Sequence, residues 1–200
     1  VGHIFRFNNA LSKAKQILEN GGIGDPYYLE LSWSTWLKPL PERDIIFDLA
    51  PHPIDIVNFL LEEWPVEVIA VGNSYERKME GREEVAFITA RLPGQVIAQI
   101  TLSWLYSGPK KREVVIVGSG GTMMIDALSQ TLSVYREGSE ERMDIRPNNT
   151  IRDMIDHFVD TVLNGKPPSN SALIGAISVM VLEAATESLR RGGVPIRTRI

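Results

Sequence analysis

Apolar residues recur along the chain with two different periods, and the changes of period predict the order of helices and strands. A spacing of three to four residues predicts a helix after Asn8 or Asn9 that ends at Gly21-Gly22, one that begins near Asp48 to Ala50, one over about 151–163 and one over about 172–191. Alternating apolar and polar positions predict strands over about 1–7, 27–36, 66–76, 83–91, 95–105, 112–118, 121–126 and 131–136.

The connections between the strands of the middle segment are short. Pro93-Gly94 is typical of a hairpin turn, and Gly108-Pro109 of a longer bend. Because a parallel crossover needs roughly a dozen residues or more, these strands are expected to pair mainly as antiparallel neighbours. The pattern predicts an α+β domain over residues 1–200, with an open, mostly antiparallel sheet of about six to eight strands and helices packed on one face. The other face of the sheet is expected to be exposed to solvent or covered by a partner.

Composition narrows the classes of function. The net charge is −4 and no basic stripe is present, so nucleic acid is not an expected partner. The longest basic run, Lys110-Lys111-Arg112, is interpreted as a solvated turn. The absence of cysteine excludes disulfides, thiolate zinc sites and a thiol nucleophile, and no other pattern supports a metal site. No apolar run of about 18 residues and no signal peptide stands out, which favours a cytoplasmic protein without a membrane contact.

One segment carries the strongest chemical signal. Asp48, His52 and Asp55 stand at positions i, i+4 and i+7, within an apolar helical run, and so fall on one helix face. A carboxylate near an imidazole can fix its tautomer and raise its pKa, which suits a general acid/base. The competing interpretation is that Asp48 caps the helix, His52 lies at the surface and Asp55 is solvated.

For several other candidate residues, a structural role competes with a functional one. Arg6 is a donor for carboxylates, phosphates or sugar hydroxyls, or it pairs with a structural acid. His157 is expected to pack or to lie at the surface. The glycines of 118–121 follow a strand, but position 123 is Met and no helix is expected after it, so they predict a hairpin rather than a nucleotide-binding loop. The aromatic residues expected on strands would be core, or on the open face could stack on sugar rings or form an oligomer contact: Trp33, Trp36, Trp104 and Tyr106.

An ordered set of segments resembles the C-terminal domain of the glucose-fructose oxidoreductase/inositol dehydrogenase (Gfo/Idh/MocA) family. The segments are Gly2–Asn8, Gly24–Tyr28, Phe47–Ile56, Gly118–Thr122, Phe158 and Gly165–Pro168. Members of this family are two-domain NAD(P)-dependent oxidoreductases, many of which oxidise a secondary alcohol on a sugar, cyclitol or nucleotide sugar. Their N-terminal Rossmann domain binds the cofactor and carries a catalytic Lys. Their C-terminal domain is an open sheet with helices on one face that supplies the substrate site and, commonly, the oligomer interface.

The resemblance assigns roles to particular residues. It implies that His52 is the acid/base at the reacting hydroxyl and that Asp48 orients it or binds substrate. It further implies substrate contacts by Asp55, Arg6 and Asn8, and we add Tyr106 as a candidate for substrate binding. NAD or NADP would be bound mainly by the missing N-terminal domain, the substrate would be a small polyol or sugar, and the open sheet face would form a homo-oligomer.

Three interpretations therefore remain. In the first, the chain is the substrate-binding half of a dehydrogenase, and a start inside a predicted strand at Val1 agrees with a piece of something longer. In the second, it is a stand-alone, non-catalytic ligand-binding or oligomerisation module. In the third, it is an independent hydrolase or isomerase that uses Asp48 and His52 alone, although no nucleophile or oxyanion donor accompanies the pair.

Overall fold

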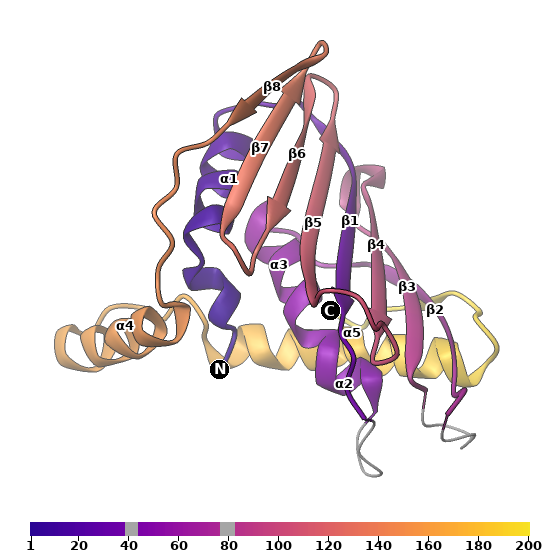
Figure 1. Ribbon diagram of the computed structural model, residues 1–200. Coiled ribbons are helices and arrows are strands. Elements are labelled where there is room, and N and C mark those ends of the chain that lie inside the picture. Colours follow the sequence, from indigo (N-terminus) through magenta and orange to yellow (C-terminus); the bar gives the residue numbers. More distant parts are fainter. Residues whose placement is uncertain (39–43, 77–82) are drawn as a thin grey trace.

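A single curved sheet organises the computed structural model, which describes residues 1–38, 44–76 and 83–200 (Figure 1). Its nine strands lie in the order β8-β7-β6-β5-β1-β4-β3-β2-β9. They are β1 Pro26–Ser34, β2 Glu67–Asn73, β3 Val85–Arg91, β4 Ile97–Ser103, β5 Lys111–Gly118, β6 Gly121–Asp126, β7 Thr131–Arg136, β8 Ser139–Arg142 and β9 Ile196–Arg197. The predicted fold class, an open and mostly antiparallel sheet backed by helices, is confirmed.

The sheet contains one parallel pair among the described strands, β1 with β4. The two helices α2 and α3 and the β2–β3 hairpin separate these strands in the sequence, which is enough chain for a parallel crossover. β1 is also antiparallel to β5. As a result Ser34 at the end of β1 pairs with both Ser103 and Lys111, so that the ends of three strands meet at one place.

Five α-helices and two short 3-10 turns complete the described structure. They are η1 Ile4–Phe7, α1 Asn9–Glu19, α2 Ile45–Leu49, α3 Pro51–Leu61, η2 Pro93–Gln95, α4 Thr150–Asn164 and α5 Ala172–Arg190. In Figure 1 the strands β5–β8 pass in front of α1 and α3, and α4 projects sideways from the body. The buried apolar residues of the sheet face these helices, whereas apolar residues exposed on the other face include Tyr28, Phe87, Ile97 and Met124.

Two predictions made from the sequence differ from the structure: the strand over residues 1–7 and the position of Asp48 at the start of its helix. Residues 1–7 form no strand, because the N-terminus instead bonds to the carbonyl of Asn170 beside α5, and Ile4–Phe7 coil into η1. The helix predicted to begin near Asp48 is preceded by α2, whose cap is Asp44: its carboxylate accepts the backbone N–H groups of Ile46 and Phe47. Asp48 is therefore a residue inside a helix and not a cap.

α5 is the one described helix that is long and apolar enough to cross a membrane by length and composition. About a third of the residues in that stretch are buried, and the helix packs against β2 and α3. Its buried side includes Ser188, which accepts a hydrogen bond from the backbone of Ala70 at 2.9 Å. α5 is therefore packed on the sheet along one side and exposed along the rest.

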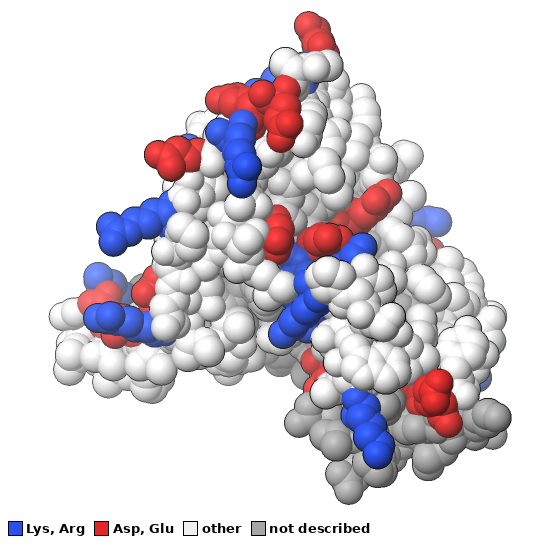
Figure 2. Space-filling model, in the orientation of Figure 1, with Lys and Arg blue, Asp and Glu red and all other residues white. Residues whose placement is uncertain are grey.

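The face seen in Figure 2 is unevenly charged. Side chains of both signs gather at the β7–β8 end of the sheet, and a second mixed group lies near the middle of the view. Most of the remaining surface on this side is uncharged. The exposed apolar positions of the open sheet face are therefore not screened by a continuous layer of charged side chains.

Candidate active site

Asp48 and His52 lie at the junction of α2 and α3, next to the meeting point of the three strand ends. The Nε1 atom of buried Trp104 donates a hydrogen bond to Oδ2 of Asp48 at 3.3 Å. The half-buried imidazole of His52 stands edge-on to Phe5, with ring centroids 5.3 Å apart. Its Nδ1 is shut off from solvent and has no hydrogen-bond partner among the described residues. The two residues are thus held by separate contacts from the strand side and from η1.

The surroundings of His52 lower the pKa of its imidazole, although the nearby carboxylate of Asp48 acts to raise it. Burial lowers its pKa from an ordinary value of 6.5 to about 4, and the positive charge of Arg112 acts in the same direction. Asp48 raises the pKa, as the spacing predicted, but its effect is smaller than those of burial and Arg112. The net effect is therefore a lowered pKa. At neutral pH the imidazole is neutral and able to accept a proton.

Arg112 is a residue of this site that sequence reasoning missed. Its side chain is buried against the ring of Trp33, 5.5 Å from the ring centroid, and burial lowers its pKa to about 10. One terminal nitrogen donates to the carbonyl oxygens of Ser34 and Lys111, at 3.4 and 2.6 Å. The interpretation of 110–112 as a solvated turn is wrong for this residue. The alternation of Arg112 with buried Val114 and Ile116 was the signal that places it on the helix side of β5.

A second buried cluster joins α3 to η1, and His3 in it is close enough to His52 for the charge of His52 to lower the pKa of His3. The Nε atom of Arg6 donates to Oδ1 of Asp55 at 2.8 Å, and a terminal nitrogen donates to Asn58 at 2.7 Å. The same terminal nitrogen lies 2.7 Å from Oδ1 of Asp55, as an ion pair. Asp55 is 1% exposed, and burial raises its pKa to about 6 although Arg6 opposes this. His3 lies 3.8 Å from the same carboxylate oxygen. Arg6 and Asp55 are therefore paired, as one of the two interpretations of the sequence had it, but Oδ2 of Asp55 is buried and has no hydrogen-bond partner among the described residues.

The two remaining predicted residues, Asn8 and Tyr106, make contacts with other residues. Asn8 is fully buried: its carbonyl oxygen accepts from the backbones of Ala10 and Leu11, and its amide donates to the carbonyl of Ala127 at 2.9 Å. Both ends of that side chain are occupied in capping α1. Tyr106 lies half-buried just after β4, with the Lys111 ammonium 5.2 Å from its ring centroid.

The described residues supply no phosphate-binding loop for a dinucleotide. Gly118 and Gly121 pair across the β5–β6 hairpin, as predicted, and no helix follows. A Cβ atom at Gly118 would lie 2.4 Å from the carbonyl oxygen of Ile23, so the glycine serves a close approach between backbones. A nicotinamide cofactor therefore has no fitting cradle in this part of the chain. The described residues also contain no cluster of three or more side chains able to hold a metal ion.

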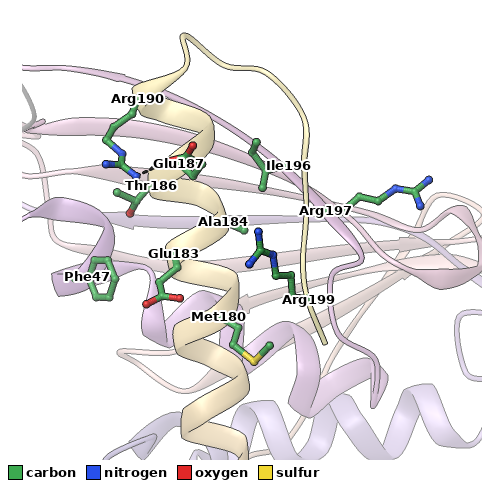
Figure 3. A pocket seen from close by; sticks show the side chains of 10 residues that line it. All are labelled: Phe47, Met180, Glu183, Ala184, Thr186, Glu187, Arg190, Ile196, Arg197 and Arg199. Carbon is green, nitrogen blue, oxygen red and sulfur yellow. Dashed lines mark hydrogen bonds and ion pairs between the residues drawn. The ribbon is translucent and has the colours of Figure 1, made fainter.

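A separate cavity of about 400 Å³ lies beside α5 (Figure 3). Glu183, Glu187 and Arg190 of the helix and Arg197 and Arg199 of the C-terminal segment line it. Glu187 is paired with Arg190 at this wall. The cavity contains neither Asp48 nor His52, so its lining is distinct from the acid/base pair.

The open, mostly antiparallel sheet backed on one face by helices defines an α+β domain. The chain belongs to the Gfo/Idh/MocA family, because residues 11–124 match the GFO/IDH/MocA C-terminal domain. It is 26% identical over 178 residues to a UDP-N-acetylglucosamine 3-dehydrogenase of Acidithiobacillus ferrooxidans, covering 84% of this chain and 54% of that protein. It is 24% identical over 202 residues to a myo-inositol 2-dehydrogenase of Thermotoga maritima, covering 92% and 60%.

Solved structures confirm the fold. The Acidithiobacillus ferrooxidans enzyme superposes with a TM-score of 0.83 at 23% identity, over 96% of this chain and 61% of that one. An oxidoreductase of Agrobacterium radiobacter, solved with NAD+, L-tartaric acid and magnesium, superposes with a TM-score of 0.86 at 22% identity, over 99% and 64%. The chain spans less than two thirds of the length of these relatives.

Proposed function

We propose that this chain is the substrate-binding part of an NAD(P)-dependent dehydrogenase that oxidises a secondary alcohol of a sugar, cyclitol or nucleotide sugar. The observation that carries the proposal is a neutral, half-buried His52 beside the Trp104-bound carboxylate of Asp48. Family membership supports it, as do relatives named as dehydrogenases of UDP-N-acetylglucosamine and myo-inositol.

Oxidation of an alcohol removes a hydride from carbon and a proton from the hydroxyl group. A nicotinamide cofactor would supply the hydride acceptor, and in this proposal it is bound mainly by an N-terminal domain outside this chain. His52 receives the proton. Because Nδ1 is enclosed, Nε2 is the ring nitrogen that a substrate hydroxyl can reach, and Asp48 stabilises the imidazolium that forms.

The further parts of the proposal concern binding and assembly. The substrate is a small polyol or sugar. Arg6 and Asp55 are further candidates for binding it, and the Oδ2 atom of Asp55, which has no hydrogen-bond partner among the described residues, is the acceptor that this pair still offers. Copies of the chain pair through the open sheet face, where Phe87 and Ile97 are exposed. A cytoplasmic location stays a prediction.

The experiment that tests this function uses the protein expressed from its complete reading frame. We expect the intact protein to reduce NAD+ or NADP+ with a sugar or polyol, and His52→Ala to lower kcat by about 10²–10⁴-fold, the usual contribution of a positioned acid/base. His157→Ala is the matched control, because His157 lies on α4 and bonds to Ser169 at 3.0 Å. Unchanged turnover in His52→Ala would remove His52 from the mechanism.

The intact mass of the same protein tests the alternative of a stand-alone binding module. A species larger than 22.3 kDa that carries or reduces a nicotinamide cofactor supports the dehydrogenase. A protein of 22.3 kDa that neither binds nor reduces the cofactor would favour the non-catalytic module.

A further inference from the structure

α4 buries less of itself than the other described α-helices. None of its residues is buried in the described structure, whereas each of the other four has buried residues. The element that it mainly packs against is η1. Figure 1 shows α4 projecting sideways from the body of the domain, beside the N-terminus. A helix in this position either lies in water or carries a contact for another folded unit.

The apolar side of α4 is the exposed one. Its residues recur at helical spacing and are between 45% and 76% exposed; together they form the apolar stripe of α4, namely Ile151, Ile155, Phe158, Val159, Val162 and Leu163. An amphipathic helix normally turns such a stripe toward a core. The polar side of α4 has partners of its own, since Arg152 pairs with Asp156 at 3.6 Å and Asp160 with Lys166 at 2.7 Å. A contiguous apolar surface of this kind marks a contact with another folded unit.

A groove of about 510 Å³ continues the apolar stripe toward the body of the domain. Ile155 and Phe158 form its wall on α4, and Ala172 at the start of α5 lies on another side. The N-terminal residue, Val1, also lines it. The groove therefore joins the exposed stripe to the point where the described chain begins.

Val1 is held in place at this groove. Its backbone nitrogen donates to the carbonyl oxygen of Asn170 at 3.1 Å, and the side-chain amide of Asn170 donates to the carbonyl oxygen of Val1 at 2.5 Å. The Val1 side chain fits against Gly175 of α5, where a Cβ atom would stand 2.6 Å from it. A peptide N–H group can make the first bond as well as a terminal amine can. A chain that continued ahead of Val1 would therefore meet the domain at the groove, beside α4.

The proposed enzyme supplies an occupant for this surface. It requires a cofactor-binding part ahead of Val1, and this chain covers only 54% and 60% of two related dehydrogenases, so each of them has a domain-sized portion without a counterpart here. A second copy is already accommodated by the open sheet face, whose exposed residues Phe87 and Ile97 belong to β3 and β4. The part ahead of Val1 is thus the unit that is tethered next to the stripe.

We propose that the apolar stripe of α4, with the groove beside it, is the surface on which the cofactor-binding part of the intact enzyme docks. The inference rests on the proposed function, since it names the surface where the two parts of that enzyme meet. It also gives the contact a consequence for catalysis. α4 packs against η1, and the ring of Phe5 in η1 stands 5.3 Å from the ring of His52. Docking on α4 therefore holds the cofactor-binding part at a fixed position relative to the acid/base, as hydride transfer requires.

The test is thiol labelling of the protein expressed from its complete reading frame, read by mass spectrometry of the peptide that contains α4. This chain has no cysteine, so Val162→Cys and Asp156→Cys each place a single thiol in it, on the apolar stripe and on the polar side of the same helix. Within this domain the side chains of both positions are about two-thirds exposed. We expect the thiol at position 162 to react with N-ethylmaleimide about tenfold more slowly than the one at 156, because a covered thiol reacts only when the contact opens. Equal rates overturn the inference.

Dilution distinguishes a tethered part from a second copy. Slow labelling at position 162 that persists when light scattering gives the mass of one copy supports the inference. Slow labelling that is lost at that mass would assign the apolar stripe to a contact between copies, against the inference.

A charge substitution tests the same surface through stability and turnover. Val162 is 65% exposed in this domain, so Val162→Asp leaves the core of the domain intact. We expect it to lower the melting temperature of the intact protein and to reduce kcat/KM by about tenfold, because a covered carboxylate without a partner opposes docking. Asp156→Asn is the matched control on the polar side of α4 and should keep wild-type values, since its exposed ion pair contributes little. Wild-type stability and turnover in Val162→Asp would overturn the inference.

Cofactor reduction by the same protein keeps the two proposals apart. Fast labelling at position 162 in a protein that reduces NAD(P)+ would leave the proposed dehydrogenase standing and remove the inference. Slow labelling in a larger protein that reduces no nicotinamide cofactor would leave the docking surface standing and remove the dehydrogenase. An intact mass of 22.3 kDa would overturn both, because no further part would exist to dock.

Discussion

The indole of Trp104 donates a hydrogen bond to the carboxylate of Asp48 at 3.3 Å, which ties a buried residue just after β4 to the carboxylate whose charge raises the pKa of His52. This bond restrains Asp48 from the strand side, while the helix backbone restrains it from the other. Since a carboxylate stabilises an imidazolium best where its oxygens are held in place, we expect Trp104 to act as a positioning residue for the proposed proton transfer.

Trp104→Phe removes the donor and keeps most of the buried volume. We expect kcat of the intact enzyme to fall by about tenfold, the lower end for a hydrogen bond to a charged group because this bond is long. The melting temperature should change little, and KM should move less than kcat. Trp36→Phe, at a position that is 62% exposed, is the control. Equal kinetics in the two variants would show that the bond does not position Asp48.

The pH dependence of stability follows from three buried groups. Burial lowers the pKa of His3 and of His52 from 6.5 to about 4, so between these values the unfolded chain binds more protons at the histidines and stability rises with pH. Burial raises the pKa of Asp55 from 3.8 to about 6, which acts in the opposite direction over nearly the same interval. Because two histidines make the free energy of unfolding rise with pH and one carboxyl group makes it fall, the net effect is a rise.

We therefore expect the free energy of unfolding to rise with pH by at most about 1.4 kcal/mol per unit between about pH 4.5 and 6, and to level off above about 6.5. Urea unfolding at a series of pH values measures this slope. His3→Asn should reduce this slope, because it removes one of the two histidines that make stability rise with pH. A stability that falls as pH rises through this interval would show that Asp55 dominates.

Much of the fold could be predicted, because local rules agree with the tertiary structure. Asn8 caps α1 as the sequence indicates, and the alternation over 131–136 gives β7. The strand Ser139–Arg142 was missed because all four residues are polar and exposed, so no alternation marks it. The parallel pairing of β1 with β4 was missed because it joins segments that only the crossover brings together.

The site could be predicted in part for the same reason. The spacing of Asp48 and His52 brings them to one junction even though a helix boundary at Ala50 separates them. The direction of the His52 pKa shift was not predictable, since it depends on burial and on Arg112, which a distant strand supplies. Asn8 was given a substrate role by resemblance, but its polar atoms are used within the fold.

Asp55 and Arg6 allow a test of structural against substrate-binding roles. Asp55→Leu leaves a buried guanidinium without its counter-charge, and we expect a loss of about 3–5 kcal/mol in the free energy of unfolding. Adding Arg6→Met to Asp55→Leu should recover much of that loss, because a buried pair replaced by apolar groups is often nearly neutral. Urea unfolding measures both. A double variant no more stable than the single one would argue against a simple structural pair.

A surface pair supplies the control for that comparison. The Nζ atom of Lys15 lies 2.7 Å from Oε1 of Glu62, and the side chain of Glu62 is largely exposed. Glu62→Gln should leave the unfolding transition almost unchanged, because water screens this pair. If Glu62→Gln and Asp55→Leu had similar effects, burial would not be the cause of the difference.

The open face of the sheet tests the proposed assembly. Phe87 is 43% exposed at the centre of β3, and it lies beside Val71 of β2 in the register of the sheet. If two copies meet through this face, Phe87→Lys places a charge in an apolar contact, and the mass of the intact protein measured by light scattering should fall towards that of one copy. Leu128→Lys, a 46% exposed position in the β6–β7 turn, should keep the wild-type mass. An unchanged mass in Phe87→Lys, with the protein still folded and assembled, would place the interface on another surface.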